Sequence, residues 1–314
     1  MNGYSQLIAA APAGFALEVA DVGSIGGLHS RWRPFRSIVA GALFDPREDD
    51  AASPKTPAPG ADMIFRTALG AREETRPLYV TRRHTMTSML KPDPDWMRRF
   101  WKKEAHTEIV EEMSIKLRPL DDAARDAALR PDVLKIDIQG AELEILTGAQ
   151  NLLADSIFFV ESEVSFLKRY QNQATFCDIA AFLDRFDFEF IDFHRIKRYR
   201  HINRTGFVNL SLGRGQRAGR LAFADGYFLL REDAARQRMA RLDNKVQADF
   251  VLKAVMTLIA YGKADMAARW FDIFGDALGD AARNGVERAL RDFRRRRLTI
   301  GYLHRALEYP GGKV

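Results

Sequence analysis

A glycine-rich segment, DVGSIGG at residues 21–27, follows directly after the short apolar run at 15–20. Glycines let a backbone turn tightly and approach a ligand closely. A helix that starts after such a turn offers free N–H groups to a polar or negatively charged ligand. The segment therefore predicts either a ligand-binding loop or an ordinary turn from a strand into a helix.

Asp45 ends the next apolar run, at 37–44, and Pro46 follows it. An acidic side chain at the end of the second strand of a nucleotide-binding sheet accepts hydrogen bonds from both hydroxyls of a ribose. Nicotinamide and S-adenosylmethionine sites both use this geometry. The alternative is a helix cap or a plain turn, which the following proline suits equally well.

Lys135 and Asp137 are charged residues within the otherwise apolar run at 133–138, VLKIDI. Burying a charge is costly unless the charge is paired, so such residues usually have a task. We expect Asp137 to face a crevice at the end of this strand, or Lys135 to pair with a carboxylate of a neighbouring strand. Glu142 and Glu144 fall in the first turn of the next helix, where the helix dipole favours acidic side chains.

Candidates for acid–base chemistry come from a strand and a loop. Glu161 and Glu163 share one face of a predicted strand by its period of two, so one of them can point into a cleft. The alternative is that these acids pair with Lys135 or Arg169. His84 lies in a polar stretch that can close over an acceptor, although a single loop histidine is more often simply solvated.

Apolar runs alternate with helix-like segments along residues 15–230. This alternation predicts an α/β fold with a doubly wound, mostly parallel sheet that is covered on both faces. Ligands of such sheets lie outside the carboxyl ends of the strands, where the residues above fall. The expected strands are 15–20, 37–44, 63–69, 133–138, 157–164, 188–193 and 226–230, with a helix at 176–186.

From Arg231 onward the strand patterns end, and alanine, arginine and leucine dominate. We expect two domains, a sheet domain at 1–230 and a helical extension at 231–314. The run from Arg294 to Arg297 is either a solvated basic face or a contact for an anionic partner. The expected helices of the extension are 232–262, 264–280 and 283–307.

The composition bounds these interpretations. The chain has 314 residues, of which 46% are hydrophobic and 29% charged, which excludes a wholly disordered chain, a collagen and a coiled-coil rod. Cys177 is the one cysteine, so a disulfide within the chain and a CxxC metal site are excluded, and the scattered histidines predict no metal site.

The charge and the hydropathy pattern indicate surroundings and partners. The net charge of +6 favours acidic partners weakly. The sequence shows neither a basic leader nor a long apolar run, so we expect a cytoplasmic protein without a membrane-spanning helix. A homo-oligomer is compatible with the sequence. Segments at 49–62 and 213–220 are typical of loops.

The motifs DVGSIGG, FDP and VLKIDIQGAELEILTGA resemble those of the FkbM family of S-adenosylmethionine-dependent methyltransferases. The usual runs of that family are close to DVGAN-G, FEP and LKIDVEGAELEVLKGA. Their order and spacing agree over about residues 15–230 but not over the helical extension. The resemblance implies a seven-stranded, Rossmann-like class I methyltransferase fold with S-adenosyl-L-methionine as its cofactor.

The resemblance also implies roles for residues of the first two motifs. Gly23, Ser24 and Gly26 would form the loop under the methionine part of the cofactor. Asp21 would anchor that loop or the cofactor's amino group. Asp45 stands where the family has glutamate and would bind the ribose.

Later residues would surround the other parts of the cofactor and the acceptor. Ala68 and Leu69 would border the adenine. Asp137 would face the reacting sulfonium and the acceptor. Together with Glu161 and His84, Asp137 is a candidate catalytic residue.

Two departures from the family pattern bear on the chemistry. Ser24-Ile25 replaces the usual Ala-Asn, and Gln139 replaces the usual glutamate. A glutamine orients an acceptor hydroxyl but cannot take its proton. The resemblance implies methyl transfer to a small-molecule or glycan acceptor, with a hydroxyl of a glycan or secondary metabolite as the leading class. The alternatives are a nicotinamide-dependent oxidoreductase, for which the glycine pattern fits less well, and a catalytically degenerate domain that binds a cofactor or a partner.

Overall fold

The computed structural model spans residues 1–314, and the described part excludes residues 1, 25, 47–57, 207–217 and 309–314 and the side chains of 296–308. The chain divides into two compact units, which we describe separately. The sheet unit consists of Glu18–Leu28 and Ala40–Ala235. The helical unit consists of Met1–Leu17, His29–Val39 and Arg236–Val314.

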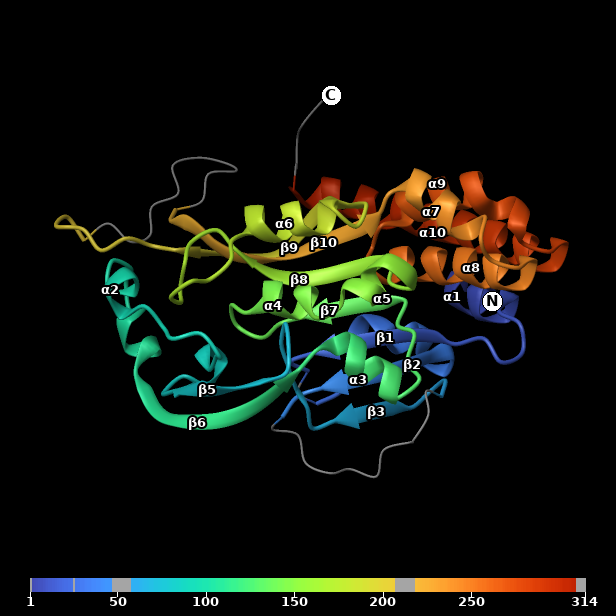
Figure 1. Ribbon diagram of the computed structural model, residues 1–314. Coiled ribbons are helices and arrows are strands. Elements are labelled where there is room, and N and C mark those ends of the chain that lie inside the picture. The colour runs from blue at the N-terminus through green and yellow to red at the C-terminus, as the bar shows by residue number, and fades with distance from the viewer. Residues whose placement is uncertain (1, 25, 47–57, 207–217, 309–314) are drawn as a thin grey trace. The chain divides into compact units, whose positions relative to one another are not determined.

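A seven-stranded sheet forms the centre of the sheet unit (Figure 1). Its strands follow the order β3 (Asp62–Phe65), β2 (Val39–Phe44), β1 (Leu17–Val22), β7 (Val133–Ile136), β8 (Phe159–Ser165), β10 (Arg220–Leu230) and β9 (Phe188–Tyr199). Strand β2 is parallel to β3, and β7 is parallel to both β1 and β8. Strand β10 is antiparallel to both of its neighbours. The predicted doubly wound, mostly parallel sheet is thereby confirmed.

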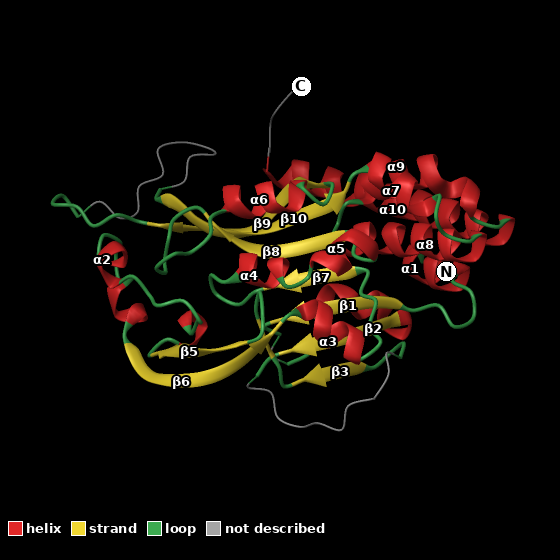
Figure 2. Cartoon of the chain, viewed as in Figure 1, coloured by secondary structure: helices red, strands yellow, loops and turns green. Residues whose placement is uncertain are grey.

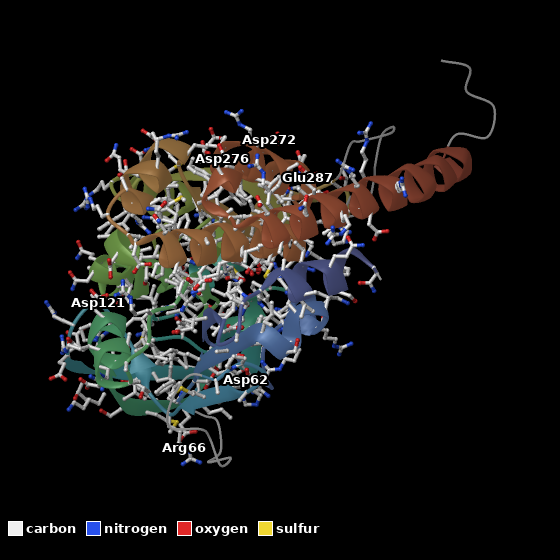
Figure 3. The ribbon with its side chains drawn as sticks, turned by 90° about the vertical axis from the view of Figure 1, so that its right-hand side faces the viewer. Asp62, Arg66, Asp121, Asp272, Asp276 and Glu287 are labelled. Atoms are coloured by element: carbon white, nitrogen blue, oxygen red, sulfur yellow. The ribbon has the colours of Figure 1, made fainter. Side chains whose placement is uncertain are left out.

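Helices pack against this sheet (Figure 2). They are α3 (Leu120–Asp126), α4 (Glu142–Thr147), α5 (Gln150–Asp155) and α6 (Phe176–Asp184). The carboxylate of Asp121, labelled in Figure 3, accepts hydrogen bonds from the backbone N–H groups of Asn151 and Leu152 at 2.9 and 3.1 Å. These bonds satisfy donors that the first turn of α5 leaves unpaired. Helix α6 confirms the helix expected at 176–186, and Thr175 and Asp178 form a capping box at its start.

The expectation of a single strand at 63–69 is wrong. The chain leaves the main sheet after Phe65, and Ala68 pairs with Leu117 in a separate sheet. Arg66 and Thr67 interrupt the apolar run at this change, and they were the available sign of the break. The second sheet has the order β4 (Ala68–Leu69), β6 (Ile109–Arg118) and β5 (Glu74–Thr81).

Strands β5 and β6 lie in a stretch for which the sequence predicts no strands. Most of their side chains are exposed or half-buried, and β6 carries charged residues such as Glu111 and Glu112. Without a buried apolar face, the pattern that identifies a strand is weak. The connection between β5 and β6 contains the short helices η2 (His84–Met86), α2 (Pro94–Met97) and η3 (Glu104–Thr107).

The helical unit joins both ends of the chain. It contains α1 (Gly3–Ala10), η1 (Ser30–Ile38), α8 (Asn244–Ala260), α9 (Ala264–Phe274), η4 (Gly275–Ala277) and α10 (Asp280–Glu308), and α7 (Glu232–Met239) leads into it. The predicted helical C-terminal segment is therefore confirmed. The expected helix at 232–262 is instead two helices, because Asp243 accepts a hydrogen bond from the N–H of Val246 at 2.9 Å and starts α8.

Helices α1 and α10 approach closely in this unit because glycine lies at their contact. A Cβ atom on Gly3 would lie 2.8 Å from the ring of Phe293. The N–H of Gly3 donates to the Asp292 carboxylate at 2.8 Å. Ion pairs of Asp276 with Arg283 and of Glu287 with Arg291 lie on the surface of the unit (Figure 3).

The loops that the sequence predicts at 49–62 and 213–220 lie largely outside the described residues. In the described part of the chain, no helix has both the length and the apolar character that crossing a membrane requires.

Candidate functional site

A cavity of about 280 Å³ lies in the sheet unit, at the carboxyl ends of β1, β2, β4 and β7. The residues that line it from these strand ends are Val22, Gly23, Phe44, Asp45, Pro46, Thr67, Ala68, Leu69, Asp137, Ile138 and Gln139. The second group comes from α4, the small sheet and the segment after β5, and consists of Ile145, Leu78, Ile115, His84, Thr85, Thr87, Ser88 and Met89. The cavity therefore brings together six of the predicted site residues: Gly23, Asp45, Ala68, Leu69, His84 and Asp137.

Gly23 is held where no other residue fits. Its φ is +82°, and a Cβ atom there would lie 2.1 Å from the carbonyl oxygen of Asp137. Its N–H donates to the carbonyl of Phe44 at 2.8 Å, and the N–H of Asp137 donates to the carbonyl of Val22 at 3.0 Å. The ends of three strands thus meet around one glycine, which leaves its backbone open to a ligand.

Ser24 and Gly26 shape the turn beyond Gly23. The Ser24 hydroxyl is buried and donates to the carbonyl of Gly27 at 3.2 Å. Gly26 has a φ of +83°, a conformation that favours glycine. Neither residue is part of the cavity lining, so their expected place under the cofactor stays a prediction.

Asp45 lies with the predicted adenine-bordering residues. Its side chain is 1% exposed, and its N–H donates to the carbonyl of Phe65 at 3.2 Å. The lining also includes Ala68 and Leu69, which are buried. An acidic group and an apolar wall therefore share one end of the cavity, as a ribose and an adenine require.

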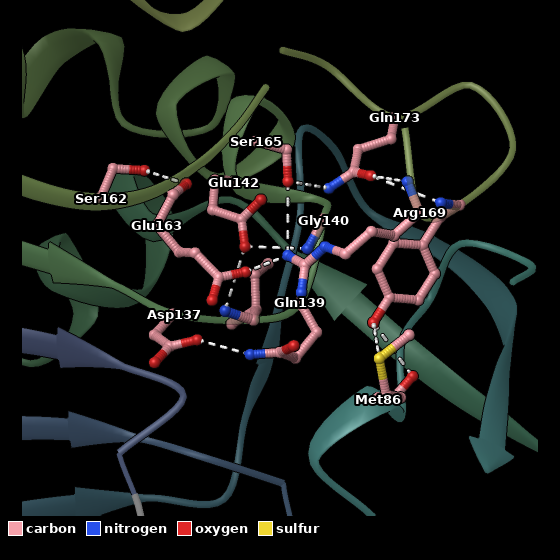
Figure 4. A network of polar contacts seen from close by, with 12 residues as sticks. Met86, Asp137, Gln139, Gly140, Glu142, Ser162, Glu163, Ser165, Arg169 and Gln173 are labelled. Atoms are coloured by element: carbon pink, nitrogen blue, oxygen red, sulfur yellow. Dashed lines mark hydrogen bonds and ion pairs between the residues drawn. The ribbon is translucent and has the colours of Figure 1, made fainter. Parts of the chain in front are cut away.

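Gln139 holds the carboxylate of Asp137. The Gln139 amide Nε2 donates to Oδ1 of Asp137 at 2.7 Å, and both residues line the cavity (Figure 4). Gln139 also has a φ of +63°, which is uncommon for a residue other than glycine. Strain of this kind is often found at functional sites. The residue that departs from the family pattern thus contacts the expected catalytic carboxylate directly.

Lys135 pairs with a carboxylate of the neighbouring strand. Its Nζ lies 2.8 Å from Oδ1 of Asp21, across the parallel β1–β7 pair. Burial raises the pKa of Asp21, and Lys135 opposes this effect. Burial works against the charged lysine, but the Asp21 and Asp137 carboxylates outweigh it and raise the pKa of Lys135. Asp21 is not part of the lining, so it supports the glycine loop from behind.

A second group of buried charges gathers around Arg169, with Glu142 from α4 and Glu163 from β8 (Figure 4). Oε1 of Glu142 accepts hydrogen bonds from the N–H groups of Gly140 and Ile138 at 2.8 and 3.3 Å. The Arg169 guanidinium pairs with Glu163 and donates to the Ser165 hydroxyl at 3.3 Å. The acid on β8 that pairs with Arg169 is therefore Glu163, as the alternative above allowed.

Burial changes the protonation of these acids. It raises the pKa of Glu142 to about 8, and Glu163 adds to the effect. Burial also raises the pKa of Glu163 to about 7, although Arg169 opposes this shift. Burial of these two acids beside one arginine therefore favours retention of a proton near neutral pH.

Glu161 and His84 have different surroundings. Glu161 is buried on β8 at the register position opposite Lys135, and it is not part of the cavity lining. His84 is exposed and lines the cavity. The catalytic roles predicted for these residues and for Asp137 stay predictions.

Comparison with known proteins identifies most of this region. Residues 40–190 match the family model for the methyltransferase FkbM domain. This segment, just under half of the chain, is similar to an FkbM methyltransferase domain. The crystal structure of methyltransferase FkbM from Methylobacillus flagellatus KT is 13% identical, with a TM-score of 0.35, and the similarity covers 68% of this chain and 43% of that one. No curated protein matches the chain.

The matched FkbM segment contains most of the cavity. Asp45, His84, Asp137 and Gln139 fall within it, and Gly23 precedes it. The segment also includes β5 and β6 of the small sheet, and the contribution of their Leu78 and Ile115 to the lining was not predicted from the sequence. Among the described residues, no group of three or more histidines, cysteines or acids is placed to hold a metal ion.

The sequence analysis also missed the role of Glu142. This residue was expected mainly to complement a helix dipole, and it does lie in the first turn of α4. Its carboxylate also holds the loop that carries Gln139. The spacing of Glu142 two residues after Gly140 was the available signal, because a short acidic side chain there reaches backbone N–H groups of the preceding turn.

Proposed function

We propose that this protein is an S-adenosyl-L-methionine-dependent methyltransferase that methylates a hydroxyl oxygen of a glycan or a secondary metabolite. One observation carries the proposal: Gly23, Asp45 and Asp137 come from distant parts of the chain and line one cavity next to the FkbM motifs. The cavity volume of about 280 Å³ is near the lower end of small-molecule sites.

The residues at the strand ends fit the methyl donor. The missing side chain at Gly23 leaves backbone open to the methionine part, and Asp45 provides the acceptor oxygens that a ribose needs. Ala68 and Leu69 provide an apolar border for adenine. When bound, S-adenosyl-L-methionine supplies a methyl group that its sulfonium has already activated.

The remaining lining suits an acceptor with several hydroxyls. Thr85, Thr87 and Ser88 bring hydroxyl groups to the cavity from the segment after β5. Asp137 is a base for the acceptor proton, and the Gln139 amide fixes its orientation. Leu78 and Met89 add apolar surface that excludes water. The chemical work of the chain is then positioning and proton removal.

The proposal is tested by ligand binding. S-adenosylhomocysteine should raise the melting temperature by several degrees, whereas NADH should not. Gly23→Val should abolish this stabilisation, because its side chain would meet the Asp137 carbonyl. A shift with NADH alone would favour the oxidoreductase, and no shift with either ligand would favour a degenerate domain.

Other expectations rest on the sequence alone. Arg294 and Arg295 are exposed on α10, while the side chains of the other two arginines lie outside the described part. An anionic partner at the run from Arg294 to Arg297, a homo-oligomeric state and a cytoplasmic location are therefore proposals that await measurement.

A further inference from the structure

A short antiparallel pairing joins the end of β9 to the segment between α2 and η3. The N–H of Trp101 donates to the carbonyl of Arg200 at 2.8 Å, and the N–H of Ile202 donates to the carbonyl of Arg99 at 2.9 Å. Phe100 is directly opposite His201 in this pairing. Two stretches about a hundred residues apart in sequence therefore form one small surface.

The alternation of side chains divides this pairing into two faces. The Phe100 ring contacts the rings of Tyr199 and His201, with centroids 5.6 and 4.7 Å apart, so these three share one face. Their neighbours in sequence must point to the opposite face. We call that side the basic-apolar face, which consists of Arg99, Trp101, Ile196, Arg198, Arg200 and Ile202.

The basic-apolar face exposes large apolar side chains to water. The exposed fractions are 42% for Trp101, 43% for Ile196 and 59% for Ile202. A single exposed apolar side chain needs no explanation, but a group of them within one patch marks an interaction site.

The charge on the same face is positive. In the described part of the chain, Arg99, Arg198 and Arg200 make no ion pair with a carboxylate. The adjoining residue Lys102 is also exposed and without an acidic partner there. The face therefore offers several uncompensated cations among tryptophan and isoleucine side chains.

We propose that the basic-apolar face binds the surface of a membrane that contains anionic lipids. Arginine and lysine near such a surface are attracted by its negative potential. Tryptophan favours the boundary between headgroups and acyl chains, and isoleucine gains from burial below it. The charged and the apolar side chains of the face can therefore both make favourable contacts with one partner, the anionic bilayer.

A nucleic acid fits this face less well. Base stacking needs open aromatic rings, but Arg99 and Arg220 lie over the ring of Trp96 at 4.2 and 5.7 Å, and Lys102 lies over that of Trp101 at 4.5 Å. The exposed isoleucines also offer neither charge nor hydrogen bonds to the phosphates of a nucleic acid. These observations favour a bilayer over a polynucleotide or an acidic polysaccharide.

The face belongs to the same rigid core as the cavity wall. One buried apolar cluster contains Ala68 and Met89 from the cavity lining and Phe100 and Tyr199 from beneath the face. Membrane binding requires no methyl donor, so it is a property separate from the proposed function.

The test is co-sedimentation of the full chain with vesicles. Phosphatidylcholine vesicles with about one third phosphatidylglycerol should bind the protein, whereas pure phosphatidylcholine should bind it at least about tenfold more weakly. Raising the salt concentration should weaken binding. Trp101 fluorescence should move to shorter wavelength on binding, and Trp101→Ala should remove that change.

Paired variants separate the face from net charge. Arg198→Glu with Arg200→Glu should lower vesicle affinity by at least about tenfold. Arg72→Glu with Arg125→Glu makes the same charge change on exposed residues outside the face and should retain binding. Trp101→Ala with Ile202→Ala should weaken binding at unchanged net charge.

Three results would overturn the proposal. They are no difference between the two kinds of vesicle, equal losses in both charge-reversed variants, and binding to an oligonucleotide or heparin in place of vesicles. S-adenosylhomocysteine binding, measured on each variant, should be unchanged, so failure of this proposal is distinguishable from failure of the proposed function.

Discussion

Two groups of buried charges lie beside β7 and β8, and they differ in their access to the cavity. On the cavity side, Lys135 pairs with Asp21, and Asp137 extends the group into the lining. On the sealed side, Glu142 and Glu163 share Arg169. The Lys135 side chain is 19% exposed, whereas that of Arg169 is 2% exposed.

This difference indicates two tasks within one motif. The cavity side keeps a carboxylate available to a ligand and supports the glycine loop. The sealed side holds the backbone of residues 138–140 through Glu142, and burial raises the pKa of this acid and so favours its protonated form. The same run of sequence thus provides chemistry on one side and loop geometry on the other.

The largest expected effect concerns the two cations. Arg169→Met should destabilise the protein by about 3–5 kcal/mol, because it leaves the buried Glu163 carboxylate with no counterion. Lys135→Met should cost less, since water reaches that group. Urea unfolding of both variants measures the difference, and a larger loss for Lys135→Met would reverse the assignment of the sealed side.

Ligand binding, unlike stability, should be more sensitive to changes at the cavity than to changes on the sealed side. Asp45→Ala should weaken S-adenosylhomocysteine binding by about 1–3 kcal/mol through lost charge-assisted hydrogen bonds. Glu142→Gln should leave binding nearly unchanged, since a glutamine oxygen still accepts from the Gly140 and Ile138 N–H groups. Calorimetry on both variants tests this, and an unaffected dissociation constant for Asp45→Ala would contradict the ribose assignment.

The sealed side should also make stability depend on pH. The pKa of Glu142 is raised from its ordinary 4.5 to about 8, so the folded protein holds a proton that the unfolded chain has released. Stability should therefore fall as pH rises between these values, by at most about 1.4 kcal/mol per pH unit for one proton. Glu142→Gln should flatten this slope in urea unfolding at several pH values. A stability that rises over the same range would show that the acids are ionised.

The smallest effect is expected at Gln139. Gln139→Glu replaces a hydrogen-bond donor to Asp137 with a second carboxylate, and two adjacent carboxylates disfavour ionisation of both. The acid limb of the methyl-transfer pH profile should then move up by about one pH unit. The affinity for S-adenosyl-L-methionine should change by less than about threefold. Gln139→Met removes the donor without adding charge and should move the profile less. An unchanged profile in Gln139→Glu would remove Asp137 from proton transfer.

The sequence predicted those parts of the fold that carry continuous apolar runs. The strands around Val133–Ile136 and Phe159–Ser165 are buried on both faces, so composition alone identifies them. The small sheet was not predicted, because β5 and β6 are half-exposed and rich in charge. The pairing of α1 with α10 joins opposite ends of the chain, and no local pattern reports such a contact.

The site was predicted where a residue lies just beyond a strand end. Gly23, Asp45 and Asp137 follow from that rule, because parallel strands bring their carboxyl ends together. The polar stretch around His84 was expected to close over an acceptor, but which of its residues line the cavity did not follow, since β5 and β6 on either side of it were not predicted. The sequence did not show that Glu161 lies opposite Lys135 while Glu163 pairs with Arg169, because this depends on the register of β8 against β7.

A crystal structure with S-adenosylhomocysteine tests the central claim most directly. The account predicts a ribose hydrogen-bonded to the Asp45 carboxylate, an adenine beside Ala68 and Leu69, and a sulfur that faces Asp137. Density for the ligand elsewhere, or a ribose without contact to Asp45, would contradict the claim that these strand ends form the methyl-donor site.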